Sequence, residues 1–173
     1  MLGKLQHSSL GALAFRHGCL QDAAAIFTLE SESFPADERA SIESIHLRLT
    51  EAHDYFLVVE HSCAIVGYVN GTCVEDEDFG HESMTLHCSQ RKHLVIHSVT
   101  VHPRYRRQRI GLMMLRKYVQ ILLNRSHLDS VLLLTKAYLL GFYSSAGFSF
   151  KRPSNIIHGQ VNKRIKSKRD RNL

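Results

Sequence analysis

The sequence has no long hydrophobic run, few cysteines and no spacing typical of a metal site. A membrane-spanning helix needs about 18 consecutive apolar residues, and no stretch approaches that length, so we expect a soluble protein with no membrane partner. His81, Glu82 and His87 lack the spacing of zinc ligands, so we expect no metal. The cysteines include no Cys-x-x-Cys pair, which argues against a disulfide framework and favours a reducing, cytoplasmic compartment. They are Cys19, Cys63, Cys73 and Cys88.

The sequence contains neither internal repeats nor the signs of a second domain. A chain of 173 residues with 44% apolar and 22% charged residues has an ordinary globular composition and is long enough for one core. Polar residues between His7 and Gly11 interrupt the apolar ones near the N-terminus. Residues 1–11 are therefore interpreted as a short leader, with organellar targeting as the alternative. We expect one domain over residues 12–159 and a basic tail over residues 160–173.

Positive charge is concentrated near the C-terminus. The net charge is +6, but from Lys151 onward eight Lys or Arg face one acid, Asp170, a local balance of +7 that leaves −1 for the first 150 residues. The run from Lys163 to Arg169 fits a nuclear localisation signal, a contact with an acidic partner, or a solvated end. Because the run lacks aromatic residues that stack on bases, nucleic acid is disfavoured and a solvated end is favoured.

Apolar periodicity and turn residues predict alternating strands and helices. The first helix begins at Asp22, an N-cap residue, and is broken near Pro35. The expected strands are 12–16, 55–59, 64–69, 93–101, 131–134 and one that begins at 148; the other expected helices are 41–51, 110–123 and 138–146. Antiparallel strands followed by a βαβ crossover predict an α/β fold, with a mixed, mostly antiparallel sheet flanked by helices.

One predicted strand runs through a basic loop into a helix. Strict alternation along 93–101 puts His97 on one face with Val95, Val99 and Val101. The loop ends in Arg106-Arg107-Gln108-Arg109-Ile110-Gly111. A helix N-terminus offers unpaired amides and the positive end of the helix dipole, which together bind pyrophosphate. A nucleotide-like cofactor is therefore the first hypothesis.

Five short motifs occur in a recognisable order. They are Phe34-Pro35-x-Asp37-Glu38-x-Ala40-Ser41, His81-Glu82-Ser83-Met84, His97-Ser98-Val99, Arg106-x-x-x-x-Gly111 and Phe142-Tyr143-x-x-x-Gly147-Phe148. Together they resemble the GNAT superfamily of acetyl-CoA-dependent N-acetyltransferases, in particular its arylalkylamine N-acetyltransferase branch in the form found outside vertebrates. The resemblance implies the GNAT fold, acetyl-CoA as co-substrate, and acetyl transfer to a small primary amine in a ternary complex.

Acetyl transfer from acetyl-CoA to an amine requires a base that deprotonates the amine and an acid that protonates the departing thiolate. An alkylamine has a pKa of about 10.4, so a base must remove its proton before attack at pH 7. On position alone His97 is a core histidine, whereas the resemblance makes it the residue that passes the amine proton towards solvent. Val95 stands where vertebrate members carry a second histidine, so a relay would use water or Ser98. The resemblance makes Tyr143 the general acid, because a phenol with a pKa of about 10 is protonated at pH 7.

The resemblance also implies the binding residues. The cofactor-binding residues are Val99, Thr100, Val101, Arg106, Arg107, Gln108, Arg109, Ile110, Gly111 and Leu112; the substrate-binding residues are Phe34, Pro35, Met84 and Leu134. Arg109 stands where the family usually has glycine. If that position needs a positive φ, Arg109 strains the loop and weakens cofactor binding; if it does not, Arg109 adds a donor for phosphate.

Two departures from the family pattern keep other interpretations open. Lys136 stands where the family often has an acid, and after Pro153 a basic segment replaces an apolar strand, so we expect the last strand of the sheet to be missing. The acidic stretch 75–78, together with Glu82, keeps a polyamine or protein amine open as the acceptor. The alternative from another class is a catalytically lapsed GNAT-fold binding module whose basic tail contacts an acidic partner.

Overall fold

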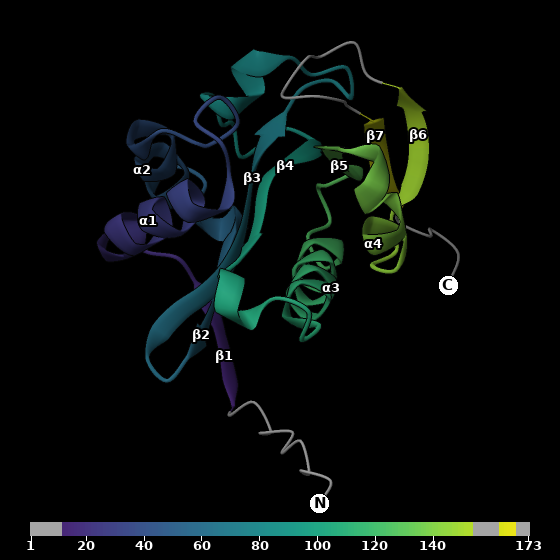
Figure 1. The fold of residues 1–173 in the computed structure, drawn as a ribbon. Coiled ribbons are helices and arrows are strands. Elements are labelled where there is room, and N and C mark those ends of the chain that lie inside the picture. The colour runs from purple at the N-terminus through teal and green to yellow at the C-terminus, as the bar shows by residue number, and fades with distance from the viewer. Residues whose placement is uncertain (1–11, 154–162, 169–173) are drawn as a thin grey trace, which may run out of the picture.

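A seven-stranded sheet forms the centre of the computed structural model, which describes residues 12–153 and 163–168 (Figure 1). The strand order is β1-β2-β3-β4-β5-β7-β6, and β4 and β5 form the one parallel pair among the described strands. The strands are β1 (Leu13–His17), β2 (Phe56–His61), β3 (Ala64–Val74), β4 (His93–Val101), β5 (Ser130–Thr135), β6 (Ser149–Pro153) and β7 (Lys163–Lys168). The expected mixed, mostly antiparallel sheet is confirmed. The predicted leader, residues 1–11, lies outside the described residues.

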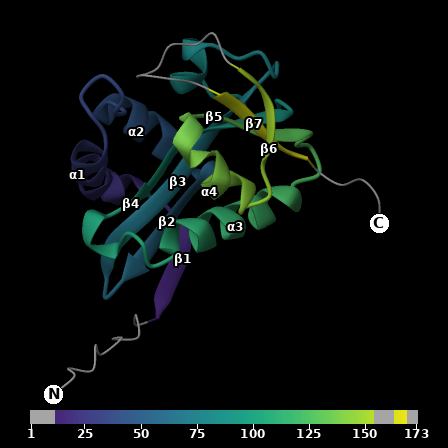
Figure 2. The ribbon, with the colours of Figure 1, turned by 45° about the vertical axis from the view of Figure 1, so that its right-hand side comes forward.

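Helices cover both faces of the sheet (Figures 1 and 2). They are α1 (Ala23–Ser33) and α2 (Ile42–Thr50) on one face, and α3 (Ile110–Leu123) and α4 (Leu140–Ser144) on the other. Short 3₁₀ turns are η1 (Leu20–Asp22), η2 (His53–Tyr55), η3 (His81–Met84), η4 (Pro103–Tyr105) and η5 (Ala137–Leu139). The largest apolar cluster packs beneath α3, with Met114 and Leu115 fully buried, and a smaller one lies beneath α1 and α2 around Ile26 and Ile45. No helix within the described ranges is long and apolar enough to cross a bilayer.

The β2–β3 hairpin turns at Ser62 and Cys63, which have φ angles of 50° and 63°. Two successive left-handed residues are the mark of a type I′ turn, whose twist matches that of the strands it joins. The predicted hairpin is confirmed, with a turn of two residues because Glu60 and His61 belong to β2.

A β-bulge at His97 changes which residues of β4 share a face. Asn70 pairs with Ser98 whereas Gly71 pairs with Ile96, so His97 is an extra residue in β4. Beyond it, Val99 packs on the α3 side of the sheet and Ser98 points to the α1 side, where it contacts Glu30. Strict alternation over 93–101 is therefore wrong beyond the bulge, because the extra residue shifts the period by one.

The expectation that the last strand is missing is wrong. Lys163–Lys168 forms β7, which is inserted between β5 and β6 and pairs antiparallel with both. Strand pairing uses backbone amides and carbonyls, which a basic segment supplies as well as an apolar one does. Six residues of the predicted tail therefore belong to the sheet, while Ser154–Gly159 of the preceding segment lies outside the described residues. Deleting residues 160–173 would remove a strand.

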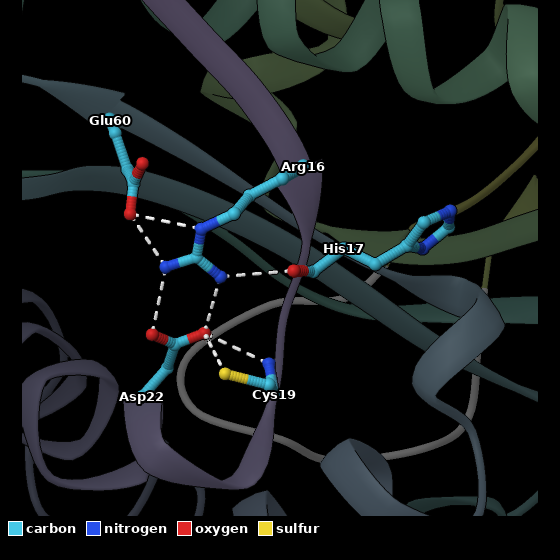
Figure 3. A network of polar contacts seen from close by, with 5 residues as sticks. All are labelled: Arg16, His17, Cys19, Asp22 and Glu60. Carbon is cyan, nitrogen blue, oxygen red and sulfur yellow. Dashed lines mark hydrogen bonds and ion pairs between the residues drawn. The ribbon is translucent and has the colours of Figure 1, made fainter.

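A network around Arg16 ties β1 to β2 and to the start of α1 (Figure 3). Its guanidinium donates to both oxygens of Asp22, at 2.7 and 2.9 Å, and to Glu60 Oε1 at 2.6 Å. Asp22 is the N-cap residue of α1, yet its carboxylate makes no cap bond to that helix and accepts instead from the Cys19 amide. The hydrogen bond from Arg16 lowers the pKa of Asp22, so the network is ionised at neutral pH.

Candidate active site

The strands β4 and β5 separate at the middle of the sheet. Their parallel pairing runs from His93–Ser130 to Ile96–Leu133 and stops there, although β4 continues to Val101 and β5 to Thr135. The bulge at His97 follows immediately after the last pair. The two strands therefore separate beyond Ile96 and Leu133, which leaves an opening between them.

A cleft of about 550 Å³ lies on the α3 side of this opening. Its lining joins the end of β4, the loop before α3, the first turn of α3, and α4. The residues are Ser33, Phe34, Val99, Val101, Tyr105, Arg106, Arg107, Arg109, Ile110, Gly111, Leu112, Leu139, Phe142 and Tyr143. Most of the predicted cofactor residues thus meet one predicted catalytic residue, Tyr143, in a single cavity. The side chains of Thr100 and Gln108 do not line it.

The loop before α3 has the geometry of an anion site. Arg107 and Arg109 are both left-handed, with φ angles of 64° and 63°. Arg109 is the N-cap residue of α3, and no side chain caps the helix there. The first helical hydrogen bond of α3 runs from the Met113 amide to Arg109 O, at 3.0 Å. The amides of residues 110–112 come before this bond, so they point out of the N-terminus of the helix. Unsatisfied amides, the helix dipole and several guanidinium groups all favour a bound phosphate.

Arg109 does have a positive φ, which decides between the two alternatives that the sequence left open. A left-handed residue other than glycine costs roughly 1–2 kcal/mol, so this loop is strained. The strain does not remove the charge, because the Arg109 side chain still lines the cleft. The structure therefore meets the condition of the first alternative, a strained loop, while the guanidinium remains at the cleft.

Arg106 connects this loop to its surroundings. Its Nε donates to Val101 O at 2.9 Å and its Nη2 donates to Ser33 Oγ at 3.1 Å. The second bond joins the loop to the C-terminal end of α1, next to Phe34. The loop before α3 and the end of α1 are thus in direct contact, and both line the cleft.

Tyr143 is held in α4 between aromatic rings. Its ring centroid lies 5.0 Å from that of Phe142 and 5.9 Å from that of Phe148, and the residue is only 8% exposed. Burial raises the pKa of its phenol above the usual value of about 10. The phenol is therefore protonated over the physiological pH range, as a proton donor must be.

His97 lies on the other side of the opening. Its Nε2 is 2.7 Å from Thr72 Oγ1, on the face of the sheet that α1 and α2 cover. The imidazole is half-buried and does not line the cleft on the α3 side. The sequence predicted that Val99 and Val101 flank it on one face, and this is wrong because the bulge turns both to the α3 side. The two predicted catalytic residues therefore come from opposite faces.

The predicted substrate residues divide between the two faces as well. Phe34 lines the cleft, while Pro35 is exposed and its carbonyl accepts hydrogen bonds from the amides of Glu38 and Arg39. Leu134 packs on the α1–α2 side, against the cluster of Val74, Phe79, Val95 and Leu132. Met84 offers its carbonyl to Arg48 Nη2 at 3.1 Å.

An ion pair spans the α1–α2 side of the opening. Lys136 Nζ lies 2.8 Å from both carboxylate oxygens of Glu38. Lys136 directly follows β5, and Glu38 lies in the loop between α1 and α2, so the pair joins two segments that are 98 residues apart. Hydrogen bonding to Glu38 raises the pKa of Lys136.

A buried polar layer under α1 and α2 was not predicted. Glu30 of α1 is 1% exposed and accepts from the Tyr68 hydroxyl, from Ser98 Oγ and from the Ala40 amide. Arg48 of α2 is 2% exposed and donates to Asn70 Oδ1, and burial lowers its pKa to about 10. The available signal was a charged residue at core spacing in each helix, Glu30 four residues after Ile26 and Arg48 three after Ile45.

The described residues contain no group of three or more His, Cys, Asp and Glu that could hold a metal ion. The arrangement supplies a protonated phenol, an imidazole and an anion site, which suit proton transfer around a phosphorylated carrier.

Two sequence comparisons point to one family. The sequence model of the acetyltransferase (GNAT) family matches residues 23–148. Serotonin N-acetyltransferase of Mesocricetus auratus is 26% identical over 163 residues, which cover 92% of this chain and 79% of that protein.

Solved structures share the fold at low sequence identity. The loading GNATL domain of CurA from Lyngbya majuscula has a TM-score of 0.79 at 15% identity, covering 91% of this chain and 98% of that one. The putative acetyltransferase yncA of Salmonella typhimurium, solved with acetyl-CoA, has a TM-score of 0.69 at 17% identity, covering 94% and 97%. These likenesses show the arrangement of the elements described above.

Proposed function

The chain belongs to the acetyltransferase (GNAT) family and is an N-acetyltransferase that uses acetyl-CoA, and we propose that its acceptor is a small primary amine of the arylalkylamine class. The observation that carries the proposal is the opening between β4 and β5, with Tyr143 on the cleft side and His97 on the other. The amine class is supported by the 26% identity to serotonin N-acetyltransferase and by apolar residues at the opening, including Phe34 and Leu134.

The cleft fits the co-substrate in charge and in shape. Arg106, Arg107 and Arg109 would hold the pyrophosphate together with the amides at the start of α3. Val101 and Phe142 wall the cleft closely beside Gly111, where a Cβ would lie in van der Waals contact at 3.4 Å from Val101 Cγ2 and 3.5 Å from Phe142 Cζ. The backbone of Val99–Val101, beyond the last β4–β5 pair, would pair with the extended arm of the co-substrate.

Each catalytic residue has one proton to move. Acetyl-CoA, when bound, supplies the acetyl group as a thioester. Tyr143 donates its phenolic proton to the departing thiolate, and its raised pKa keeps that proton in place until then. His97 accepts the proton of the attacking amine on the α1–α2 side of the opening. The acceptor therefore approaches from the face opposite to the co-substrate, and transfer proceeds in a ternary complex without an acyl-enzyme.

The α1–α2 loop would shape the acceptor side. Phe34 closes the edge of the cofactor cleft, and Glu38, four residues later, is linked to Lys136 beyond β5. Pro35, Met84 and Leu134 complete the proposed acceptor surface. Aromatic and aliphatic walls favour the burial of an aromatic side chain.

A polyamine is the second candidate acceptor, because acidic residues gather in a separate hollow. Glu75, Asp76, Asp78 and Glu82 line a pocket of about 170 Å³ near η3, together with Arg91. A polycation would be attracted to that surface, and a monoamine would not depend on it.

The test compares acceptors on the purified full chain. Thiol release from acetyl-CoA is measured with tryptamine, spermidine and a lysine peptide, and the products are identified by mass. We expect the highest kcat/KM with tryptamine and a loss of about 10²-fold or more in His97→Gln, the size of one general-base contribution. A higher kcat/KM for spermidine that falls in Asp78→Asn would select the polyamine instead.

A further inference from the structure

We propose that Thr72 is a positioning residue that fixes neutral His97 in the tautomer with its proton on Nε2, which makes Nδ1 the atom that accepts the amine proton. The assignment of the tautomer stands on hydrogen-bond geometry alone. The assignment of Nδ1 as the base rests on the proposed function.

The direction of two hydrogen bonds determines the tautomer. Thr72 Oγ1 lies 2.6 Å from Ser83 O and 2.7 Å from His97 Nε2. A carbonyl oxygen can only accept, and two oxygens 2.6 Å apart need a proton between them, so the Thr72 hydroxyl donates to Ser83. A hydroxyl has one proton, so its oxygen must accept from His97 Nε2–H. In a neutral imidazole with a proton on Nε2, the lone pair is on Nδ1.

The groups that set this direction are shielded from water. Thr72 is 0% exposed and Ser83 is 3% exposed, so neither has bulk water as an alternative partner. Thr72 is fixed in the centre of β3, where it pairs with Val95 of β4. A buried carbonyl that lost its donor would have an unsatisfied hydrogen-bond acceptor, which strongly favours the arrangement in which the Thr72 hydroxyl donates to Ser83 O.

The turn η3 holds the Ser83 carbonyl in place. The Ser83 amide donates to Gly80 O at 3.2 Å and its hydroxyl donates to the same oxygen at 2.7 Å. The next carbonyl, that of Met84, accepts from Arg48 Nη2, so the C-terminal end of the turn is anchored to α2. The sequence motif His81-Glu82-Ser83-Met84 thus contributes the backbone carbonyl of Ser83 to the site.

The proton balance follows from this tautomer. The amine N–H bond breaks as its nitrogen forms the amide bond, and the proton forms a new bond to Nδ1. The imidazolium then carries protons on both nitrogens, and the Nε2–H bond to Thr72 stays intact throughout. Loss of the Nδ1 proton to solvent restores the starting state, so the ring neither flips nor changes its partner during turnover.

The first test is spectroscopic and independent of activity. In full-length protein labelled with ¹⁵N-histidine, the His97 side-chain signals are identified by their loss in His97→Gln. We expect Nδ1 in the unprotonated range and Nε2 in the protonated range at a pH where the ring is neutral. The opposite pattern, or a wild-type mixture of tautomers, would overturn the proposal.

Two variants separate positioning from folding. Thr72→Val removes the hydroxyl, and Thr72→Ser keeps it while it removes only the methyl group. We expect Thr72→Ser to retain the Nε2–H tautomer, and Thr72→Val to show a mixture and a kcat about tenfold lower with an unchanged KM for acetyl-CoA, the effect of losing one neutral hydrogen bond. If Thr72→Val folds and keeps a pure Nε2–H tautomer, the proposal is wrong. If it does not fold, the wild-type and Thr72→Ser spectra decide.

The outcomes also distinguish this inference from the proposed function. A wild-type protein with the expected tautomer but no acetyl transfer to any amine would contradict the proposed acceptor and leave Thr72 as the residue that sets the tautomer. Normal acetyl transfer by a protein whose neutral His97 carries its proton on Nδ1 would support the proposed function and contradict the role of Thr72.

Discussion

Replacing Arg109 with glycine is expected to raise stability and lower cofactor affinity at the same time. Arg109 has φ 63° and ψ 5°, where a non-glycine residue costs about 1–2 kcal/mol. Glycine removes that cost, but it destabilises the folded state by about 0.5–1 kcal/mol because the unfolded chain gains conformational freedom. The net gain therefore lies between about 0 and 1.5 kcal/mol, and the middle of this range corresponds to a rise in Tm of about 2 °C for a chain of this size.

The loss of the guanidinium acts in the opposite direction on binding. Arg109 lines the cleft at the N-terminus of α3, and a hydrogen bond to a charged group contributes about 1.5–3 kcal/mol. Arg109→Gly should therefore weaken acetyl-CoA binding by about tenfold or more. Because the lost contact is electrostatic, the difference from wild type should shrink as salt is added.

Two matched variants separate strain from charge. Arg109→Ala keeps the strained φ without the charge, and Arg109→Lys keeps both the strain and a positive charge. Thermal unfolding without cofactor, together with calorimetric titration of acetyl-CoA at two salt concentrations, measures both quantities. A Tm for Arg109→Gly no higher than that for Arg109→Ala would refute the strain argument. Tighter binding by Arg109→Gly than by wild type would refute the phosphate contact.

Three further substitutions test other parts of the site and fold. Tyr143→Phe should lower kcat by about 10²-fold with unchanged acetyl-CoA affinity; because burial raises the pKa of Tyr143, the alkaline fall of wild-type kcat should lie above pH 10. An equal kcat in the two proteins would exclude Tyr143 as the acid. Asp22→Asn should lower the free energy of unfolding by about 1 kcal/mol at pH 7. Arg16 lowers the pKa of Asp22 in the folded protein, so the difference in the free energy of unfolding is fully present above about pH 4 and disappears as the pH falls through that lowered pKa. Urea unfolding at a series of pH values measures this difference. A difference that does not change with pH would contradict the role of the ionised Asp22. Lys136→Gln should lower the KM of a protonated amine by about threefold, because it releases Glu38 from an ion pair that contributes below about 1 kcal/mol. A raised KM would show that Lys136 helps to bind the acceptor.

Local patterns predicted most of the elements. The helix at 110–123 has the predicted bounds because its apolar residues recur at helical spacing. The α/β order and the mostly antiparallel sheet follow from the spacing of strands and turns. The cleft assembles the predicted residues between Arg106 and Leu112, except Gln108, because they are close together in the sequence at one helix start.

Features that depend on long-range pairing could not be predicted. The bulge at His97 exists only in the register between β3 and β4, and a single strand carries no sign of it. The strand Lys163–Lys168 has no apolar pattern, and its place between β5 and β6 depends on their backbone groups. The contact of Thr72 with His97 joins residues 25 positions apart, and that of Glu30 with Ser98 joins residues 68 apart.

The most direct test of the central claim is thiol release by purified protein supplied with acetyl-CoA and tryptamine, with the acetylated amine detected by mass. The account predicts one equivalent of thiol for each acetylated amine, with turnover strongly reduced in His97→Gln and in Tyr143→Phe. Binding of acetyl-CoA without release of thiol for any amine tested, or turnover that neither substitution changes, would contradict it.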